Sequence, residues 1–191
     1  MRKAKIERKT SETDITLVLD LDGTGDYSIS TGTKFLDHML GSFAKHGCFD
    51  IKIKAVGDNE HHIVEDVAIC LGNAFSKAIA DKAGIKRFGF SIVPMDDVLL
   101  LTSVDLSSRS HCSFGVKFRR KKIEDLSSEM ISHFLESLTS QTRMNLHVKL
   151  LDGKNEHHVA EAIFKSLALS MDMATSKDER KKGVPSTKGA L

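Results

Sequence analysis

The sequence predicts an α+β fold made by internal duplication of one β-β-α-β-α unit. The segment at residues 59–65, NEHHIVE, returns as NEHHVAE at residues 155–161, in a chain of 191 residues. Two more segment pairs follow the same order: 35–40 with 130–135, and 50–54 with 145–149. Ordered matches with one small gap indicate a duplication that covers most of each half.

The first half is expected to run strand, strand, helix, strand, helix. Apolar side chains at every second position predict strands over 15–21 and 51–53, and a strand near 27–30 would match the second half. Apolar residues spaced by three and four predict helices over 35–43 and 64–75. These helices have one apolar face each, which they must bury against another layer.

The second half repeats this pattern. Strands are predicted over 98–106, 114–118 and 146–150, and helices over 131–138 and 160–171. Each half should therefore form a mainly antiparallel sheet with helices on one face. The helices of the two halves should pack against each other, because neither half can cover its own apolar face.

The predicted halves are residues 1–88 and 89–191, which together form one compact duplicated domain. A glycine- and proline-containing link around residues 82–94 is the expected boundary. The polar tail from Ser176 has no core pattern, so it is either disordered or a functional arm.

Composition narrows the class of protein. Apolar residues make up 40% of the chain and charged residues 28%, as in globular proteins, and no apolar run is long enough to span a membrane. The basic start is not followed by an apolar stretch, so a secretory signal is not expected. Three cysteines without close spacing favour reduced thiols and a cytoplasmic location. A net charge of +2 gives no reason to expect nucleic acid or membrane partners.

The repeated histidine pairs indicate metal binding. His61 and Glu65 share one helix face and can chelate one ion, whereas His62 is rotated by roughly 100° and would reach a second ion. The second helix repeats this arrangement with His157, Glu161 and His158. A symmetric solution would complete the His61 and Glu65 site with one histidine of the second pair, and vice versa. Imidazole with carboxylate suits Mn, Fe, Zn, Co or Ni.

Several motifs in order resemble the imidazoleglycerol-phosphate dehydratase family, from Arg8 to the end of the chain. They are residues 8–13 (RKTSET), 35–40 (FLDHML), 61–66 (HHIVED), 95–97 (MDD), 104–109 (VDLSSR), 157–162 (HHVAEA) and 186–189 (STKG). The resemblance implies two Mn²⁺ ions per active site, and 24-subunit shells with active sites between subunits. The implied metal ligands are His38, His61, His62, Glu65, His133, His157, His158 and Glu161.

The implied reaction is the loss of water from imidazole glycerol phosphate to give imidazole acetol phosphate, a step of histidine biosynthesis. Two ions would make the imidazole ring electron-rich enough to expel the neighbouring hydroxyl, acting as Lewis acids. Glu12 is the first candidate to move protons, and Glu65 or Glu161 could exchange a metal bond for a proton. The implied substrate contacts are Glu12, His38, His46, His61, Glu65, Arg87, Arg109, His157, Lys165, Ser186, Thr187 and Lys188.

One segment departs from the family pattern. The family has a longer approach to the first pair that ends in Asp-Asp-His-His, whereas residues 57–62 read GDNEHH. The ligands are retained, so the departure concerns the loop before the helix and the contacts that it makes.

Three alternatives stay open at this point. A di-metal phosphate hydrolase would favour aspartate-rich ligands over histidines. A non-catalytic metal-binding assembly leaves Arg87, Arg109 and the tail without a role. An RNA-binding module is suggested by the basic runs at 119–122 and 180–182, but such runs are usually solvated faces and the net charge is nearly neutral.

Overall fold

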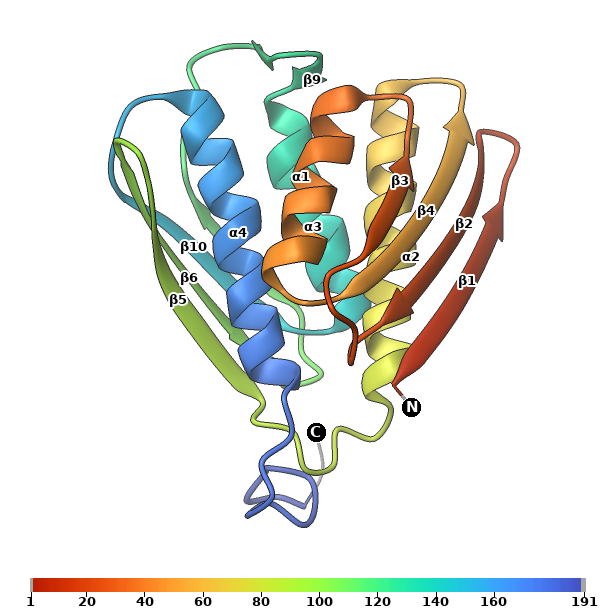
Figure 1. The fold of residues 1–191 in the computed structure, drawn as a ribbon, viewed down its shortest axis with the longest axis vertical. Helices are drawn as coiled ribbons and strands as arrows, with labels where there is room; N and C mark the ends of the chain where they lie inside the picture. Colours follow the sequence, from red (N-terminus) through yellow and green to blue (C-terminus); the bar gives the residue numbers. More distant parts are fainter. Residues whose placement is uncertain (1, 190–191) are drawn as a thin grey trace.

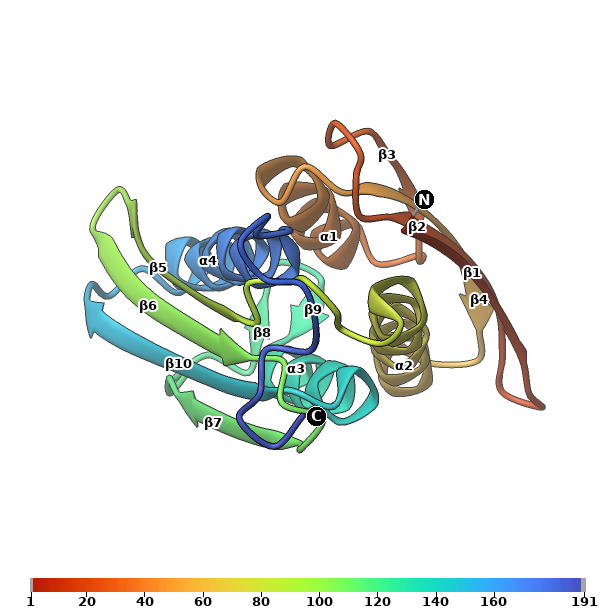
Figure 2. The same ribbon diagram turned by 90° about the horizontal axis from the view of Figure 1, so that it is seen from below.

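The computed structural model describes residues 2–189 as two four-stranded sheets with a layer of four helices between them (Figure 1). The view from below shows the helices enclosed between the sheets (Figure 2). Apolar side chains from both sheets and all four helices form one continuous core. The predicted α+β class, and the prediction that the helices pack between the halves, are confirmed.

The first half contains one mixed sheet and two helices. Its elements are β1 (Lys3–Lys9), β2 (Thr13–Asp20), β3 (Tyr27–Ser30), α1 (Lys34–His46), β4 (Asp50–Gly57) and α2 (Glu60–Ile79). The strand order is β1-β2-β4-β3, and only the pairing of β3 with β4 is parallel. The sheet is therefore mainly antiparallel, as expected.

The second half has the same topology with one insertion. Its elements are β5 (Phe88–Met95), β6 (Val98–Asp105), β7 (His111–Gly115), α3 (Glu129–Thr142), β10 (Asn145–Asp152) and α4 (Glu156–Thr175). The order β5-β6-β10-β7 repeats that of the first sheet, again with one parallel pair, β7 with β10. A short hairpin, β8 (Lys122–Ile123) with β9 (Leu126–Ser127), precedes α3.

Each four-stranded sheet has one strand more than predicted, because β1 and β5 were not recognised, and the hairpin of β8 and β9 was not predicted either. Both are edge strands. In β1 only Ala4 and Ile6 are apolar, which leaves a weak alternation. In β5 Gly89 and Pro94 suggested a linker, but an edge strand tolerates proline. Gly89 is needed there because a Cβ atom would lie 1.9 Å from the carbonyl oxygen of Ser170 on α4.

One smaller expectation is corrected, and one that was left open is decided. The strand predicted over 114–118 instead runs from His111 to Gly115. The tail from Ser176 folds back on the segment before β5. Lys86 N–H donates to the carbonyl of Ser176, and Gly84 N–H donates to that of Gly183. The tail is thus an arm attached to the boundary between the halves.

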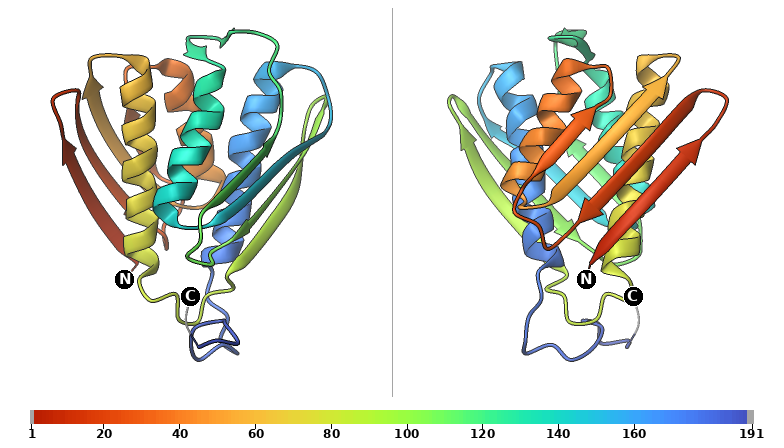
Figure 3. Two further views of the ribbon diagram at one scale, coloured as in Figure 1. Left: turned by 180° about the vertical axis from the view of Figure 1, so that it is seen from behind. Right: turned by 45° about the vertical axis from the view of Figure 1, so that its right-hand side comes forward.

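The helices of the two halves pack in pairs: α2 lies beside α3, and α1 lies beside α4 (Figure 3). All four helices begin at the upper end of the molecule in Figure 1. None of the helices in residues 2–189 has the length and apolar character needed to cross a membrane.

Candidate metal centre and anion pocket

Both histidine pairs lie in the first turn of a helix, where local sequence fixes them. Asn59 caps α2, and its side-chain oxygen accepts a hydrogen bond from His62 N–H. Asn155 caps α4 and accepts from the N–H groups of His157 and His158. An Asn cap satisfies amide groups that the first turn leaves free. The repeated Asn-Glu-His-His therefore places both pairs at the same end of the molecule.

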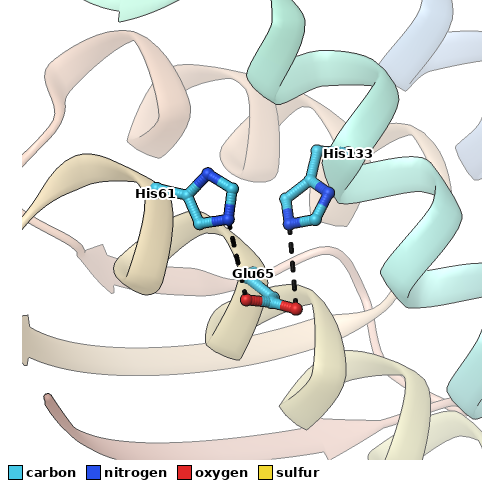
Figure 4. A group of neighbouring side chains, drawn as sticks. All are labelled: His61, Glu65 and His133. Carbon is cyan, nitrogen blue, oxygen red and sulfur yellow. Dashed lines mark ion pairs between the residues drawn. The ribbon is translucent and has the colours of Figure 1, made fainter.

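His61, Glu65 and His133 converge on one point (Figure 4). Glu65 Oε2 lies 3.9 Å from His61 Nε2, and Glu65 Oε1 lies 3.8 Å from His133 Nε2. Ligands roughly 2.1 Å from one ion lie roughly 3 Å apart when adjacent and 4.2 Å when opposite. These distances are too long for hydrogen bonds and fit a shared ion.

The surroundings of His133 support this reading. Its Nε2 atom is buried and has no hydrogen-bond partner in the described part of the chain. Buried polar atoms without partners are rare and call for an explanation, such as a bound ion. The donor set of two imidazoles and one carboxylate suits a transition metal.

The third residue of this cluster differs from the expected one. The symmetric solution placed a histidine of the second pair beside His61 and Glu65, and within one chain this is wrong. The position is taken by His133, because α3 packs directly beside α2. Gly72 of α2 allows this close packing, since a Cβ atom there would lie 2.8 Å from the Leu138 carbonyl oxygen of α3.

In the matching cluster of the second half, a lysine already bonds the glutamate carboxylate. His157 Nε2 lies 4.0 Å from Glu161 Oε2, and Lys165 Nζ bonds the other carboxylate oxygen at 2.8 Å. Burial raises the pKa of Glu161, but the hydrogen bond and charge of Lys165 outweigh it, with smaller help from His38 and His157, so the net pKa is lowered. His38 reaches this cluster from α1, as His133 reaches the first cluster from α3.

The second histidine of each pair points to a turn between strands. His62 Nδ1 lies 3.8 Å from the carboxylate of Glu12, which is in the turn between β1 and β2. His158 Nε2 lies 3.4 Å from the carboxylate of Asp96, in the turn between β5 and β6. Glu12 is thus beside the histidines, although it is distant from them in sequence.

The segment from Arg119 to Ser128 ties three helix starts together. Glu60 of α2 accepts a hydrogen bond from Ser127 N–H, and Glu156 of α4 accepts from the N–H groups of Arg119 and Arg120. The start of α1 lacks a side-chain cap of its own, and the Asp125 carboxylate accepts from the N–H groups of Lys34 and Phe35 instead. These acids favour the positive helix ends and hold the histidine helices in register.

A second site lies at the opposite end of the molecule. It is a basic pocket of about 820 Å³. Its lining includes the predicted contacts Arg87, Arg109, Ser186, Thr187 and Lys188, together with Ser107, Arg143 and Lys181. The Ser107 hydroxyl is buried without a hydrogen-bond partner in the described residues. Basic side chains around a free hydroxyl suit an anion such as phosphate.

The sequence-based prediction missed six lining residues of this pocket: Phe88, Ser107, Ser108, Arg143, Lys181 and Pro185. Ser107 stood in the quoted 104–109 motif but received no role. Arg143 gave no signal, because an isolated basic residue is usually solvated, and Lys181 belongs to the basic run at 180–182, which was interpreted as a solvated face. Arg87 is also more engaged than expected: Nε and Nη2 bond Asp105, and Nη1 donates to the Pro185 carbonyl. It therefore holds the tail as well as lining the pocket.

One chain does not bring all the predicted contacts together. The histidines are at the start of α4 and the tail follows its end, and a 20-residue helix is roughly 30 Å long. His46 and Lys165 lie between these ends, where α1 meets α4. Burial, and then the charge of Lys165, lower the pKa of His46.

Comparison with known proteins places these features in one family. The family model for imidazoleglycerol-phosphate dehydratase matches residues 31–171. Proteins of that name from Halalkalibacterium halodurans and Methanocella arvoryzae are 50% and 48% identical, each over 100% of both chains. The solved structure of the Pyrococcus furiosus enzyme is 36% identical, with a TM-score of 0.86 over 97% of this chain and 100% of that one. The Staphylococcus aureus enzyme is 30% identical, with a TM-score of 0.85 over 92% and 99%.

Proposed function

The chain belongs to the imidazoleglycerol-phosphate dehydratase family, and we propose that it dehydrates imidazole glycerol phosphate to imidazole acetol phosphate in a manganese-dependent step of histidine biosynthesis. The observation that carries the manganese proposal is the convergence of His61, Glu65 and His133 around a buried, unpartnered Nε2 atom. The basic pocket suits the phosphate of the substrate. We expect the enzyme to act in the cytoplasm, where its three free cysteines would stay reduced.

We propose that metal binds at both histidine clusters, one in each half of the repeat. The residues that would hold two Mn²⁺ ions per site are His38, His61, His62, Glu65, His133, His157, His158 and Glu161. Bound there, manganese would supply Lewis-acid stabilisation of charge on the imidazole ring of the substrate. The chain itself contributes the orientation of the ring nitrogens and carboxylates, which the capped helix starts fix before a ligand arrives.

Proton transfer is assigned to carboxylates beside the histidines. Glu12 is exposed, and its carboxylate lies 3.8 Å from His62 Nδ1, so it can reach a substrate held at that end. The buried acid Asp66 holds the strands on either side of this turn through Arg8 and Thr13. Glu65 and Glu161 are further candidates, because each could release a ligand position and accept a proton.

We propose that complete sites form only between subunits. The imidazole and phosphate of the substrate are joined by three carbon atoms, whereas the histidines and the basic pocket of one chain lie at opposite ends of α4. A histidine end of one subunit must therefore meet the basic pocket of another. Assembly of 24 subunits is the arrangement we expect.

The outer faces of the two sheets support self-association. The second sheet exposes large apolar side chains, while the first sheet exposes mainly charged ones. The exposed apolar residues of the second sheet are Phe88, Phe90, Ile92, Leu99 and Leu151. A contiguous apolar surface of this kind is typical of an interface between proteins.

The direct test is metal removal and replacement. Protein stripped with a chelator should form no ketone from imidazole glycerol phosphate, and Mn²⁺ should restore product formation. Release of inorganic phosphate instead would favour a phosphate hydrolase. Stoichiometric Mn²⁺ binding by folded protein, with neither product, would favour a non-catalytic assembly and overturn the dehydratase proposal.

The assembly proposal has its own measurement. His62→Ala and His158→Ala should lower the bound Mn²⁺ per chain and the sedimentation coefficient together, because these histidines face outward from the clusters. Lys52→Ala, on the exposed face of β4 in the first sheet and away from both histidine pairs, is the control and should change neither. Unchanged metal content and sedimentation in the first two variants would contradict their role as ligands between subunits.

A further inference from the structure

The outer histidine of each pair contacts an aspartate through the same ring nitrogen. His62 Nδ1 lies 2.8 Å from Asp58 Oδ1, and His158 Nδ1 lies 2.7 Å from Asp97 Oδ1. Both distances are short for a hydrogen bond to nitrogen, as expected when the acceptor is ionised. The contact raises the pKa of His62 and lowers that of Asp97.

The two aspartates do not occupy matching positions in the repeat. Asp58 precedes α2 in the loop after β4, where the second half has Lys154. Asp97 lies in the turn between β5 and β6, where the first half has its Glu12 turn. The same contact is therefore made by different segments in the two halves. Inheritance of one loop by duplication therefore does not account for both contacts.

An aspartate at Nδ1 determines which ring nitrogen carries the proton. The carboxylate accepts a hydrogen bond from Nδ1–H, and Nε2 then keeps its lone pair for an ion. Among the described residues, His158 Nε2 faces only the Asp96 carboxylate, at 3.4 Å, which is longer than a normal hydrogen bond. His62 Nδ1 also has the Asn59 amide nitrogen at 2.8 Å, which would favour the opposite tautomer. The charged acceptor gives the stronger bond.

We propose that Asp58 and Asp97 are positioning residues that fix His62 and His158 in the Nδ1–H tautomer, with Nε2 directed at a divalent ion. The inference rests on the proposed function only for the identity of that ion as manganese. It gives the shortened loop before His61 a role, since Asp58 belongs to that loop. It also assigns a role to two acids, from different parts of the chain, that orient the histidines without binding the ion.

Asp97→Asn is the sharpest variant. Asp97 Oδ2 accepts from the N–H groups of Lys154 and Asn155, which will keep the amide oxygen of an asparagine on that side. The amide nitrogen then faces His158 Nδ1 as a donor and forces the proton to Nε2. Substitutions of this kind preserve geometry but select the wrong tautomer. Asp58→Ala should act similarly on His62, because the Asn59 amide would be the one group left within hydrogen-bond distance of Nδ1 in the described residues, while the Glu12 carboxylate lies 3.8 Å away.

The readouts are the histidine tautomer and the metal affinity. Solid-state ¹⁵N spectra of metal-free, histidine-labelled protein should show one Nδ1–H ring fewer in each variant. Calorimetric Mn²⁺ titration should show roughly 10- to 100-fold weaker binding. Asp14 is an exposed acid on β2 that pairs with Lys9 of β1. Asp14→Asn is the control and should change neither the histidine tautomers nor the Mn²⁺ affinity.

Unchanged tautomers with unchanged Mn²⁺ affinity would overturn the proposal. If Asp97→Asn fails to fold, Asp58→Ala decides, because Asp58 is exposed and its side chain contacts only His62 in the described residues. The outcome is separable from dehydratase activity. A native protein that binds Mn²⁺ and forms no ketone would refute the proposed function, while the tautomer spectra would still decide the role of the aspartates.

Discussion

The two histidine clusters occupy matching positions of the repeat but have different surroundings. In the first cluster, Glu65 faces His61 and His133, and no lysine or arginine bonds it in the described residues. In the second, Glu161 is bonded by Lys165. The position that matches Lys165, one turn after the glutamate, is Ile69 in the first half.

The helix contacts beneath the clusters differ as well. Gly72 lets α2 and α3 approach until backbone meets backbone, and the matching residue of α4 is Ala168. The two halves thus share the histidines and the glutamate, while the neighbours of these residues differ. We expect the first cluster to hold an ion more tightly than the second, because Lys165 competes with an ion for the Glu161 carboxylate.

Gly72→Ala should have the largest effect on this comparison. The new Cβ atom would lie 2.8 Å from the Leu138 carbonyl and 2.6 Å from Gln141 Cβ, so α3 must move away from α2. We expect a loss of about 1–3 kcal/mol in the free energy of unfolding, measured by urea denaturation. Because His133 is on α3, the first cluster should also bind Mn²⁺ more weakly in a calorimetric titration.

The reciprocal variant is the control for this prediction. Ala168→Gly changes the matching helix and should cost about 1 kcal/mol through helix propensity, without moving His38 away from the second cluster. Equal losses of metal affinity in both variants would show that close packing of α2 and α3 does not define the first cluster.

Lys165→Met should have a smaller effect, of the opposite sign, on metal binding. Removing a cation that bonds Glu161 frees the carboxylate for an ion and removes repulsion worth about 1 kcal/mol or more at this range. Mn²⁺ affinity at the second cluster should rise roughly tenfold. Ile69→Lys should lower affinity at the first cluster. If a metal titration shows no change in either variant, the lysine does not distinguish the clusters.

Much of the fold could be predicted because the repeated pattern is local. The alternation in β2, β4 and β10, the apolar run in β6, and the helical spacing in all four helices are properties of neighbouring residues. The edge strand β5 could not be read in this way. Its exposed positions are apolar, with Phe90 65% exposed, and its inward positions include Gly89, so the usual pattern is inverted. Only the sheet order explains these residues.

The site was predictable in its residues but not in its grouping. Helix periodicity placed His61 and Glu65 on one face, as the structure shows. It could not show that His133 completes the group, because that depends on which helix packs beside α2. Nor could it find Asp125 at the start of α1, a contact between residues 90 or 91 positions apart in sequence. The tail motif gave the pocket some of its residues, whereas Arg143 enters through tertiary packing alone.

The smallest predicted difference between the halves is a pH dependence at the starts of β4 and β10. Asp50 accepts hydrogen bonds from the N–H groups of Thr24 and Asp26, which lower its pKa. The matching residue, Asn145, donates to the Arg109 carbonyl. Asp50 therefore stabilises the native state above its unfolded pKa of about 3.9, and this contribution is lost as pH falls through the lower folded value.

Asp50→Asn should destabilise the protein at pH 7 by less than about 1 kcal/mol, since the group is partly exposed. The difference from the native protein should shrink as the pH of urea denaturation is lowered toward 2. The stability deficit of Asn145→Asp should also shrink at low pH, but from a different cause. The ionised carboxylate repels the Arg109 carbonyl oxygen, and it can donate a hydrogen bond to that oxygen only when it is protonated. If the loss of unfolding free energy in Asp50→Asn does not depend on pH, the negative charge of Asp50 does not contribute to stability, and its backbone hydrogen bonds act independently of that charge.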